Sequence, residues 1–403
     1  MEFQRNNSSS PSSSNSSSSI LPTPHSDPMH SWWESVSKAR SRIHALAAIL
    51  PDHSHSISSL ADSDRPALSL LSSPTAYSAL SASLSGSHSD PLCHWLYDTF
   101  LSSDPHLRLV VLSFVPLLTG LYLSRIHSSQ PPSLAGFEAL LLALYAAETK
   151  SRNGKPLLVT IPDLSIPSIY HSPLRKTSPP HSPSVGLISP PLEPQLAVKS
   201  TKRASIVGVA LHSFFSQISQ MPAWSKLEFC RFAAGWAGQD CPCRTEFDRK
   251  HQDDANLNDD RDHYRDRDGD GGSVSSVEIE EVVERVGDLQ IHSGENLVVC
   301  ESEKGKGERI PLPWEILQPA LRILGHCLLG PLNSQEVKDA AAFAVRCLYA
   351  RASHDLVPQA ILATKSLIQL DIRTRETAKI AASNANANTP TKVKKPEILL
   401  VSK

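Results

Sequence analysis

LAGFEALLLALYAAETKSRNGKPLLVTIPDLSIPSIYHSP, residues 134–173, is the stretch that decides the fold. In its first part, Leu134–Glu148, apolar residues recur at helical spacing and cover most sides of the helix, which predicts a central helix. A polar break at Arg152-Asn153-Gly154 ends that helix, and the branched residues of Pro156–Ile161 then favour an extended strand. Three prolines after Ile161 exclude a regular helix. The stretch therefore predicts a buried helix joined to an ordered, proline-rich strap that lies across the helices.

Two helix starts precede this stretch and share one signal. Asp90-Pro91 and Asp104-Pro105 each place an acidic N-cap before a proline at the first helical position. They predict a helix that ends near Leu101 and a second helix over Pro105–Ile126, which Pro116 should kink or split. The longest uncharged apolar run in the second helix, Leu109–Leu123, is shorter than the ~20 residues that span a bilayer, so a buried helix is favoured.

The remaining apolar patterns predict further helices of ordinary length. The first should begin at Ser31, where Ser31-Trp32-Trp33-Glu34 has the capping-box pattern, and should bury Trp33, Val36, Ile43, Ala47 and Leu50 before it stops at Pro51. Others are predicted over residues 65–72, 74–84, 204–221, 223–238, 277–286, 313–329, 334–352 and 356–374. Helices joined by short turns predict an all-α fold, a bundle or stack of antiparallel helices with a short extended strap.

Long stretches of the 403-residue chain have a composition typical of disorder. Ten of the twelve residues from Ser8 to Ser19 are serine, so residues 1–30 are predicted to be a disordered tail. Residues 172–203 are rich in serine and proline, residues 240–274 are highly charged, and residues 381–403 are polar. We therefore expect a helical domain over residues 31–380, interrupted by a disordered linker at 172–203 and a disordered acidic loop at 240–274.

Composition also limits the location and the partners. The formal net charge of −2 gives no overall field that would attract nucleic acid. No apolar signal-peptide core occurs near the start, and the seven cysteines show no secreted disulfide pattern. The expected compartment is the cytosol.

The sequence carries no familiar catalytic or cofactor motif. G-x-S-x-G, Walker A and G-x-G-x-x-G are all absent, so we expect neither enzyme activity nor a cofactor. Asp266, Asp268, Asp270 and Gly271 resemble the opening of a calcium loop, but the twelfth position is valine instead of the bidentate glutamate. Cys241 and Cys243, with Cys230 and His251, lack the second close pair that a structural zinc site needs. No metal site is predicted.

The serine- and proline-rich linker is basic. Residues 172–203 contain five basic side chains and one acidic residue, Glu193; the basic ones are Arg175, Lys176, Lys199, Lys202 and Arg203. Such a segment could contact an anionic membrane, to which each charge contributes about 1 kcal/mol, or be an ordinary soluble linker. Both alternatives stay open. Four Ser-Pro sites, Ser172, Ser178, Ser182 and Ser189, are candidate phosphorylation sites that would cancel the basic charge.

The opening stretch also carries a family resemblance. The runs GFEALLLALYAAE (136–148), Arg152-Asn153-Gly154 and LLVTIPDLSIPSIYHSP (157–173) resemble the hyccin family in its plant-type form, and weaker likeness covers residues 90–123, 312–329 and 334–370. The resemblance implies a non-enzymatic, mostly helical subunit of the type III alpha phosphatidylinositol 4-kinase complex at the plasma membrane. Its implied partners are a tetratricopeptide-repeat scaffold, the kinase chain and a lipid-anchored tethering subunit.

The residues expected to matter are therefore those of an interaction protein. The family-signature segment either packs the fold or docks a partner, and its residues are Pro162, Leu164, Pro167, Ser168, Ile169, Tyr170 and His171. Six aromatic residues are candidates for an interface, although core positions are favoured for most of them: Trp32, Trp33, Trp224, Phe229, Phe232 and Trp236. The alternative to a kinase-complex scaffold is a stand-alone peripheral membrane or vesicle adaptor.

Overall fold

The structure is a computed structural model that describes residues 28–127, 133–161, 184–238 and 310–387. Helices dominate the described residues, and a single two-stranded sheet joins them. The predicted mostly helical fold is confirmed.

The first layer is built from short helical segments. These are α1 (Pro28–Ile49), the 3₁₀ turns η1 (Pro51–His53) and η2 (Ser59–Asp62), α2 (Ser54–Ser58), α3 (Pro66–Ser72) and α4 (Pro74–Ser83). The predicted start of the first helix is wrong, because α1 begins at Pro28 and Ser31 lies inside its first turn. Proline favours the first turn of a helix, since its missing N–H has no partner to lose there.

The two aspartate caps are confirmed. Asp90 accepts a hydrogen bond from the Leu92 amide at 2.8 Å at the start of α5 (Pro91–Leu101), and Asp104 accepts one from Leu107 at 2.8 Å at the start of α6 (Pro105–Ser113). Phe114 separates α6 from α7 (Val115–Ile126). The predicted split occurs there because Pro116 cannot donate to the carbonyl four residues earlier.

The opening stretch folds as a helix followed by a strand. Helix α8 (Ala135–Arg152) ends at Asn153, which adopts the left-handed conformation at φ 49°. Strand β1 (Leu157–Ile161) confirms the predicted extended segment and pairs antiparallel with β2 (Ser184–Ser189). In their register Leu158 lies opposite Leu187 and Thr160 opposite Val185.

Strand β2 corrects the prediction that residues 172–203 form a disordered linker. Residues 184–202 have defined positions, Leu192 is buried, and its amide donates to the Gly154 carbonyl at 3.1 Å. The strand SVGLIS contains branched residues that suit an extended conformation, and pairing with β1 satisfies its backbone. The composition of the segment did not predict this strand, because serine and proline residues surround it.

The second half consists of longer helices. They are α9 (Arg203–Ser216) with the 3₁₀ turn η3 (Ile218–Gln220), α10 (Ala223–Ala237), α13 (Trp314–Leu329), α14 (Gln335–His354) and α15 (Pro358–Ala387). Helix α9 is shorter than predicted. Helix α15 runs well beyond the predicted end at Thr374 and into the segment expected to be a polar tail, where alanines at 378, 381, 382, 385 and 387 favour helix. The helix predicted at 277–286 lies outside the described residues.

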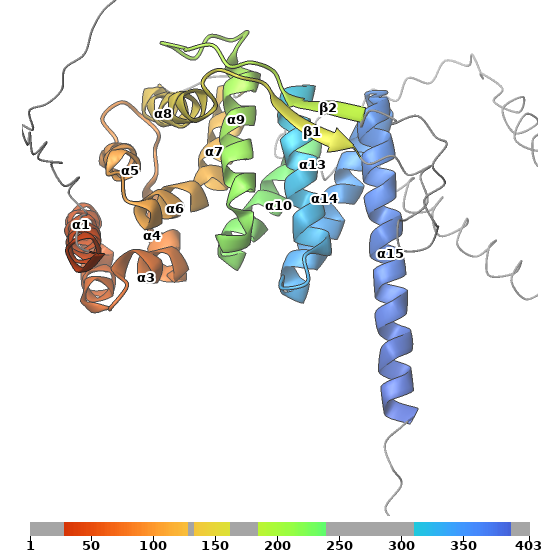
Figure 1. The fold of residues 1–403 in the computed structure, drawn as a ribbon, viewed down its shortest axis with the longest axis horizontal. Helices are drawn as coiled ribbons and strands as arrows, with labels where there is room; N and C mark the ends of the chain where they lie inside the picture. The colour runs from red at the N-terminus through yellow and green to blue at the C-terminus, as the bar shows by residue number, and fades with distance from the viewer. Residues whose placement is uncertain (1–27, 128–132, 162–183, 239–309, 388–403) are drawn as a thin grey trace, which may run out of the picture.

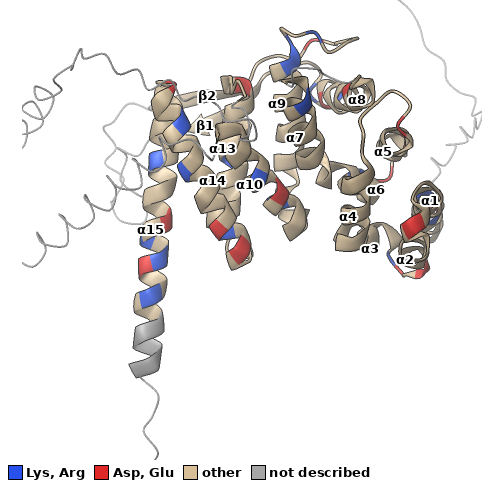
Figure 2. Cartoon of the chain, turned by 180° about the vertical axis from the view of Figure 1, so that it is seen from behind, with Lys and Arg blue, Asp and Glu red and all other residues tan. Residues whose placement is uncertain are grey.

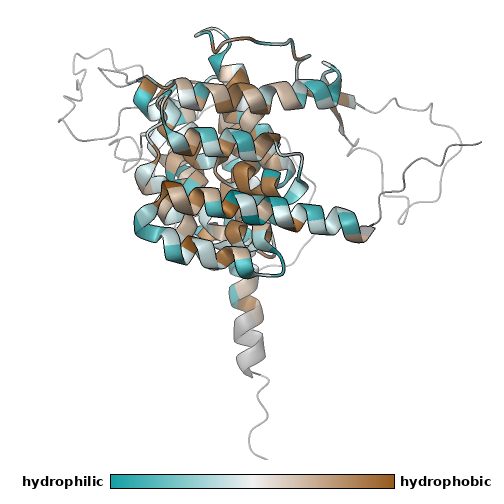
Figure 3. Cartoon of the chain, turned by 90° about the vertical axis from the view of Figure 1, so that its left-hand side faces the viewer, coloured by the Kyte–Doolittle hydropathy of each residue, from teal (hydrophilic) through white to brown (hydrophobic). Residues whose placement is uncertain are grey.

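The helices stand in a row with α1 at one end and α15 at the other (Figure 1). Helix α9 packs against α8 and α13, and α10 packs against α7 and α14. The β1–β2 ribbon runs across α13 towards the start of α15, whose second half projects from the body (Figure 1). A side view shows apolar residues where the helices face one another and polar residues outside (Figure 3).

A single large apolar cluster runs through this row of helices. Gly208 permits the close approach of α9 to α13, because a Cβ atom there would lie 2.2 Å from the Glu315 carbonyl oxygen. The stretch Pro105–Ile126 is long and apolar enough to cross a membrane, but 78% of its most apolar window is buried inside the fold. Residues 105–126 therefore form the buried central helix that the sequence predicts, divided into α6 and α7.

Candidate interaction surfaces

The described residues contain no group of His, Cys, Asp and Glu side chains that could hold a metal ion. The calcium-like loop at 266–271 and the possible zinc residues Cys241, Cys243 and His251 lie outside them. Cys230 is described and buried next to Cys327. The contact with the Cys327 thiol and burial raise the pKa of Cys230, so this thiol belongs to the apolar core.

Most of the predicted signature and phosphorylation residues cannot be placed. The family-signature segment from Pro162 to His171, together with Ser172, Arg175, Lys176, Ser178 and Ser182, lies outside the described residues. Its role in packing or docking stays a prediction. Ser189 is described at the end of β2, where it is half-buried.

Two basic side chains in the described part of the linker interact with other residues of the fold. Arg203 donates from Nε to the Tyr122 hydroxyl at 3.1 Å, and that hydroxyl donates to Glu138 at 3.1 Å. Lys202 pairs with Glu193 at 3.9 Å, whereas Lys199 is exposed. In Figure 2 the ribbon is coloured blue, for Lys and Arg residues, at the end of the molecule where α9 begins. Because buried Tyr122 holds its guanidinium, Arg203 has a packing role that the sequence did not indicate.

The aromatic residues of α10 are core residues. Phe229 and Trp236 are 0% and 2% exposed, and the Trp224 ring stacks on Tyr77 with 4.2 Å between centroids. The half-buried Phe232 ring lies over Gly120 of α7. Core positions, which the sequence favoured for most of these aromatics, are confirmed for Phe229 and Trp236.

The two tryptophans of α1 are different. Trp32 and Trp33 are 48% and 59% exposed, and their rings contact one another with 5.7 Å between centroids. The prediction that Trp33 joins the buried face is wrong, since it lies in the first two turns of α1 and the first buried residue is Val36. An exposed tryptophan pair is typical of interaction surfaces, in which tryptophan is enriched.

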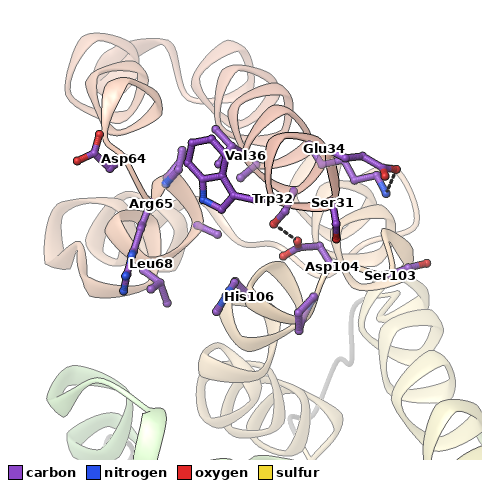
Figure 4. A pocket seen from close by; sticks show the side chains of 16 residues that line it. Ser31, Trp32, Glu34, Val36, Asp64, Arg65, Leu68, Ser103, Asp104 and His106 are labelled. Carbon is purple, nitrogen blue, oxygen red and sulfur yellow. Dashed lines mark hydrogen bonds and ion pairs between the residues drawn. The ribbon is translucent and has the colours of Figure 1, made fainter. Parts of the chain in front are cut away.

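Trp32 borders a cavity with a volume of about 680 Å³. The cavity lies between α1, the start of α3 and the start of α6, and Figure 4 shows Trp32 on one side of it and Arg65, Leu68 and His106 on the others. Ser35 donates a hydrogen bond to Asp104, the α6 cap, and so ties α1 to this wall. The cavity is open and mixed in polarity, which suits a peptide side chain better than a buried substrate.

One face of the ribbon is a second apolar surface. Leu158 and Leu187 lie opposite one another in the register and are 55% and 63% exposed. Val185, on the same face two residues away, is 58% exposed. A two-stranded ribbon is only marginally stable alone, so an exposed apolar face on one suggests that another surface covers it.

The fold can now be compared with known families. A protein-family model described as Hyccin matches residues 61–400. The chain belongs to the hyccin family. Hyccin is a family of accessory subunits that is not known to be catalytic.

The hyccin match includes the ribbon and the signature segment but begins after α1. The exposed tryptophan pair therefore lies outside the matched residues, whereas Leu158, Val185 and Leu187 lie within them. The match also extends over the long α15 helix and the segment 239–309, which the structure does not describe.

One polar cluster within the hyccin match was missed from the sequence. Arg152 of α8, His212 of α9 and Arg322 of α13 lie together between these helices, and the Arg322 Nη1 atom is 3.3 Å from His212 Nδ1. Arg152 pairs through Nε with Glu148 at 2.5 Å. Burial first, and then the charges of Arg152 and Arg322, lower the pKa of His212 to about 4. The three residues are far apart in sequence, and no motif joins them.

Proposed function

We propose that this chain is a non-catalytic scaffold subunit, of the plant-type hyccin form, in a type III alpha phosphatidylinositol 4-kinase complex. It would bind a tetratricopeptide-repeat subunit, stabilise the kinase chain and help to place the complex at the inner face of the plasma membrane. Phosphatidylinositol 4-phosphate would be made by the kinase chain. The match of residues 61–400 to the hyccin family is the observation that carries this proposal.

The physical basis would be mass action. A partner that binds only the folded subunit stabilises it by RT ln(1 + [L]/Kd), which is about 2.7 kcal/mol at a hundredfold excess over Kd. The exposed apolar residues of α1 and of the ribbon offer surface that such a partner could bury. A lipid-anchored subunit would then hold the assembly at the membrane, where the chain itself needs no spanning segment.

The stand-alone membrane adaptor is the weaker alternative. It needs a free basic segment, but two of the three described basic residues are engaged: Arg203 binds Tyr122, and Lys202 pairs with Glu193. Lys199 alone contributes about 1 kcal/mol near an anionic surface, which is too little for stable attachment. Direct lipid contact would therefore depend on Arg175 and Lys176.

Affinity purification of the tagged full-length chain tests the proposal. We expect mass spectrometry to recover a tetratricopeptide-repeat protein and a lipid 4-kinase. Two variants locate the contact: Trp32→Ser/Trp33→Ser alters the α1 surface, and Leu158→Ser/Leu187→Ser alters the ribbon. Leu362→Ser is the matched control, because Leu362 is 68% exposed on α15.

Loss of recovery in one double variant, with the control unchanged, would assign the interface to that surface. Recovery of neither partner by the wild-type chain would overturn the proposal. Binding to phosphatidylserine vesicles without any protein partner would support the adaptor instead.

A further inference from the structure

The loop before α9, residues 190–202, holds a leucine entirely in solvent. Leu196 is 99% exposed, although the loop is fixed to the fold on both sides of it. On one side Leu192 is buried, and its amide donates to the Gly154 carbonyl at 3.1 Å. On the other side the half-buried Val198 packs against the apolar core. Because both anchors hold the loop, Leu196 is presented to the surroundings instead of to the core.

The residues around this leucine are basic. The end of α8 and the residues that follow it, 150–155, lie beside the loop, because Gly154 binds Leu192. Segments 150–155 and 190–202 together contain one acidic residue, Glu193, which pairs with Lys202 at 3.9 Å. Their exposed lysines are Lys150, Lys155, Lys199 and Lys202. The surface around Leu196 therefore has a positive net charge.

A second exposed leucine has different surroundings. Leu332, in the turn between α13 and α14, is 98% exposed. Figure 1 shows this turn at the opposite end of the molecule from the loop before α9. An exposed carboxylate, Glu336, follows it in the first turn of α14, and Lys226, which donates to Asn333 of the turn, is only 7% exposed. The two leucines are almost equally exposed, but only Leu196 lies among exposed lysines.

A bilayer that contains anionic lipids matches both properties of the Leu196 surface. Lysines gain free energy near a negatively charged leaflet, and an apolar side chain gains by entering the boundary between headgroups and acyl chains. A protein partner matches less well, because lysine is depleted from protein–protein interfaces and leucine is under-represented among their hot spots. The composition of this surface therefore favours lipid.

We propose that Leu196, with the four lysines Lys150, Lys155, Lys199 and Lys202, contacts the anionic inner leaflet of the membrane. The inference deepens the proposed placement at the plasma membrane and rests on it. So few charges with one apolar side chain give weak, reversible binding, as a single lipid chain does, and not stable attachment. The contact would instead orient a chain that the lipid-anchored subunit already holds, because tethering makes it intramolecular.

Partitioning of the purified full-length chain onto vesicles tests the contact. We expect stronger binding to vesicles of phosphatidylcholine with phosphatidylserine than to phosphatidylcholine alone. Leu196→Ser should weaken this binding about tenfold. Lys155→Gln/Lys199→Gln should weaken it about fivefold for each lysine. The matched controls, Leu332→Ser and Lys379→Gln in the projecting half of α15, alter exposed residues away from the loop and should bind nearly as wild type does.

Raising the salt concentration separates the two contributions. Salt should remove the difference between the lysine variant and wild type, because exposed charges are screened, but should leave the effect of Leu196→Ser. Equal binding of wild type to both kinds of vesicle, or equal losses for Leu196→Ser and Leu332→Ser, would overturn the proposal.

Affinity purification of the same variants distinguishes lipid from protein. If Leu196→Ser loses the tetratricopeptide-repeat subunit but binds vesicles like wild type, the loop is a protein interface and the lipid contact is wrong. If the wild-type chain recovers both protein partners but does not prefer phosphatidylserine, the lipid contact fails while the scaffold role stands.

Discussion

The aromatic residues of α10 and the tryptophans of α1 are chemically alike but have opposite surroundings. Phe229 and Trp236 are almost fully buried, because α10 lies between α7 and α14. Trp32 and Trp33 are about half exposed, at the end of the helix row. The difference indicates that α10 supplies stability to the fold, whereas the start of α1 leaves apolar surface exposed, as interaction sites do.

The largest effect is expected in the buried region. Phe229→Ala removes a fully buried ring that contacts Phe214 and Trp236, and should lower the free energy of unfolding by about 3–5 kcal/mol. Urea unfolding followed by circular dichroism measures this. A loss below about 1 kcal/mol would mean that α10 is not a central core element.

A pH titration probes the cationic cluster of α8, α9 and α13. The pKa of His212 is about 4 in the folded chain and about 6.5 when unfolded, so below pH 6.5 the unfolded state binds the extra proton. Stability is therefore full above pH 6.5 and falls as the pH is lowered towards 4. Allowing for partial solvent screening, the loss is about 2–3 kcal/mol.

The control for this titration is His212→Asn, which cannot take up the proton. Its urea midpoint should fall less steeply than that of wild type between pH 6.5 and 4. Parallel curves for the two proteins would contradict the buried, neutral histidine.

A substitution at Asp104, which lines the cavity beside α1, tests whether this residue stabilises the fold. Asp104→Ala removes the α6 cap and the contact with Ser35, and should cost about 1 kcal/mol in thermal unfolding. Asp98→Ala is the matched control, since Asp98 is exposed and forms only a 3.4 Å pair with Arg42, so it should change stability by less than about 0.5 kcal/mol. Equal effects would show that the cap adds nothing.

The smallest effect on stability is expected for the exposed pair. Trp32→Ser/Trp33→Ser should change the free energy of unfolding by no more than about 0.5 kcal/mol, because surface substitutions rarely do more. If the pair forms an interface, the same variant should lose partner recovery. A stability loss as large as that of Phe229→Ala would remove the distinction between the two regions.

Local signals in the sequence predicted the helices well. Asp90, Asp104 and Pro116 act over a few residues, and the structure places the helix ends where these residues require. Strand β2 was missed because its pairing with β1 spans residues distant in sequence. The exposure of Trp33 was missed because helical periodicity assigns a face but not the position where the neighbouring helix ends.

The candidate sites were predicted less well because they also depend on contacts between residues that are distant in sequence. The contact of Arg203 with Tyr122 joins α9 to α7, and the Arg152–His212–Arg322 cluster joins three helices. Neither has a local motif. The family-signature segment was recognised from its residues, yet it lies outside the described part, so its role stays a prediction.

The most direct test of the scaffold role is the lifetime of the tetratricopeptide-repeat subunit and of the kinase chain. Both lifetimes are measured after translation is stopped, in cells with and without this protein. We expect both lifetimes to shorten in its absence and to recover when the wild-type chain is restored, since an unpartnered subunit is degraded faster. Unchanged lifetimes, with unchanged phosphatidylinositol 4-phosphate at the plasma membrane, would contradict the account.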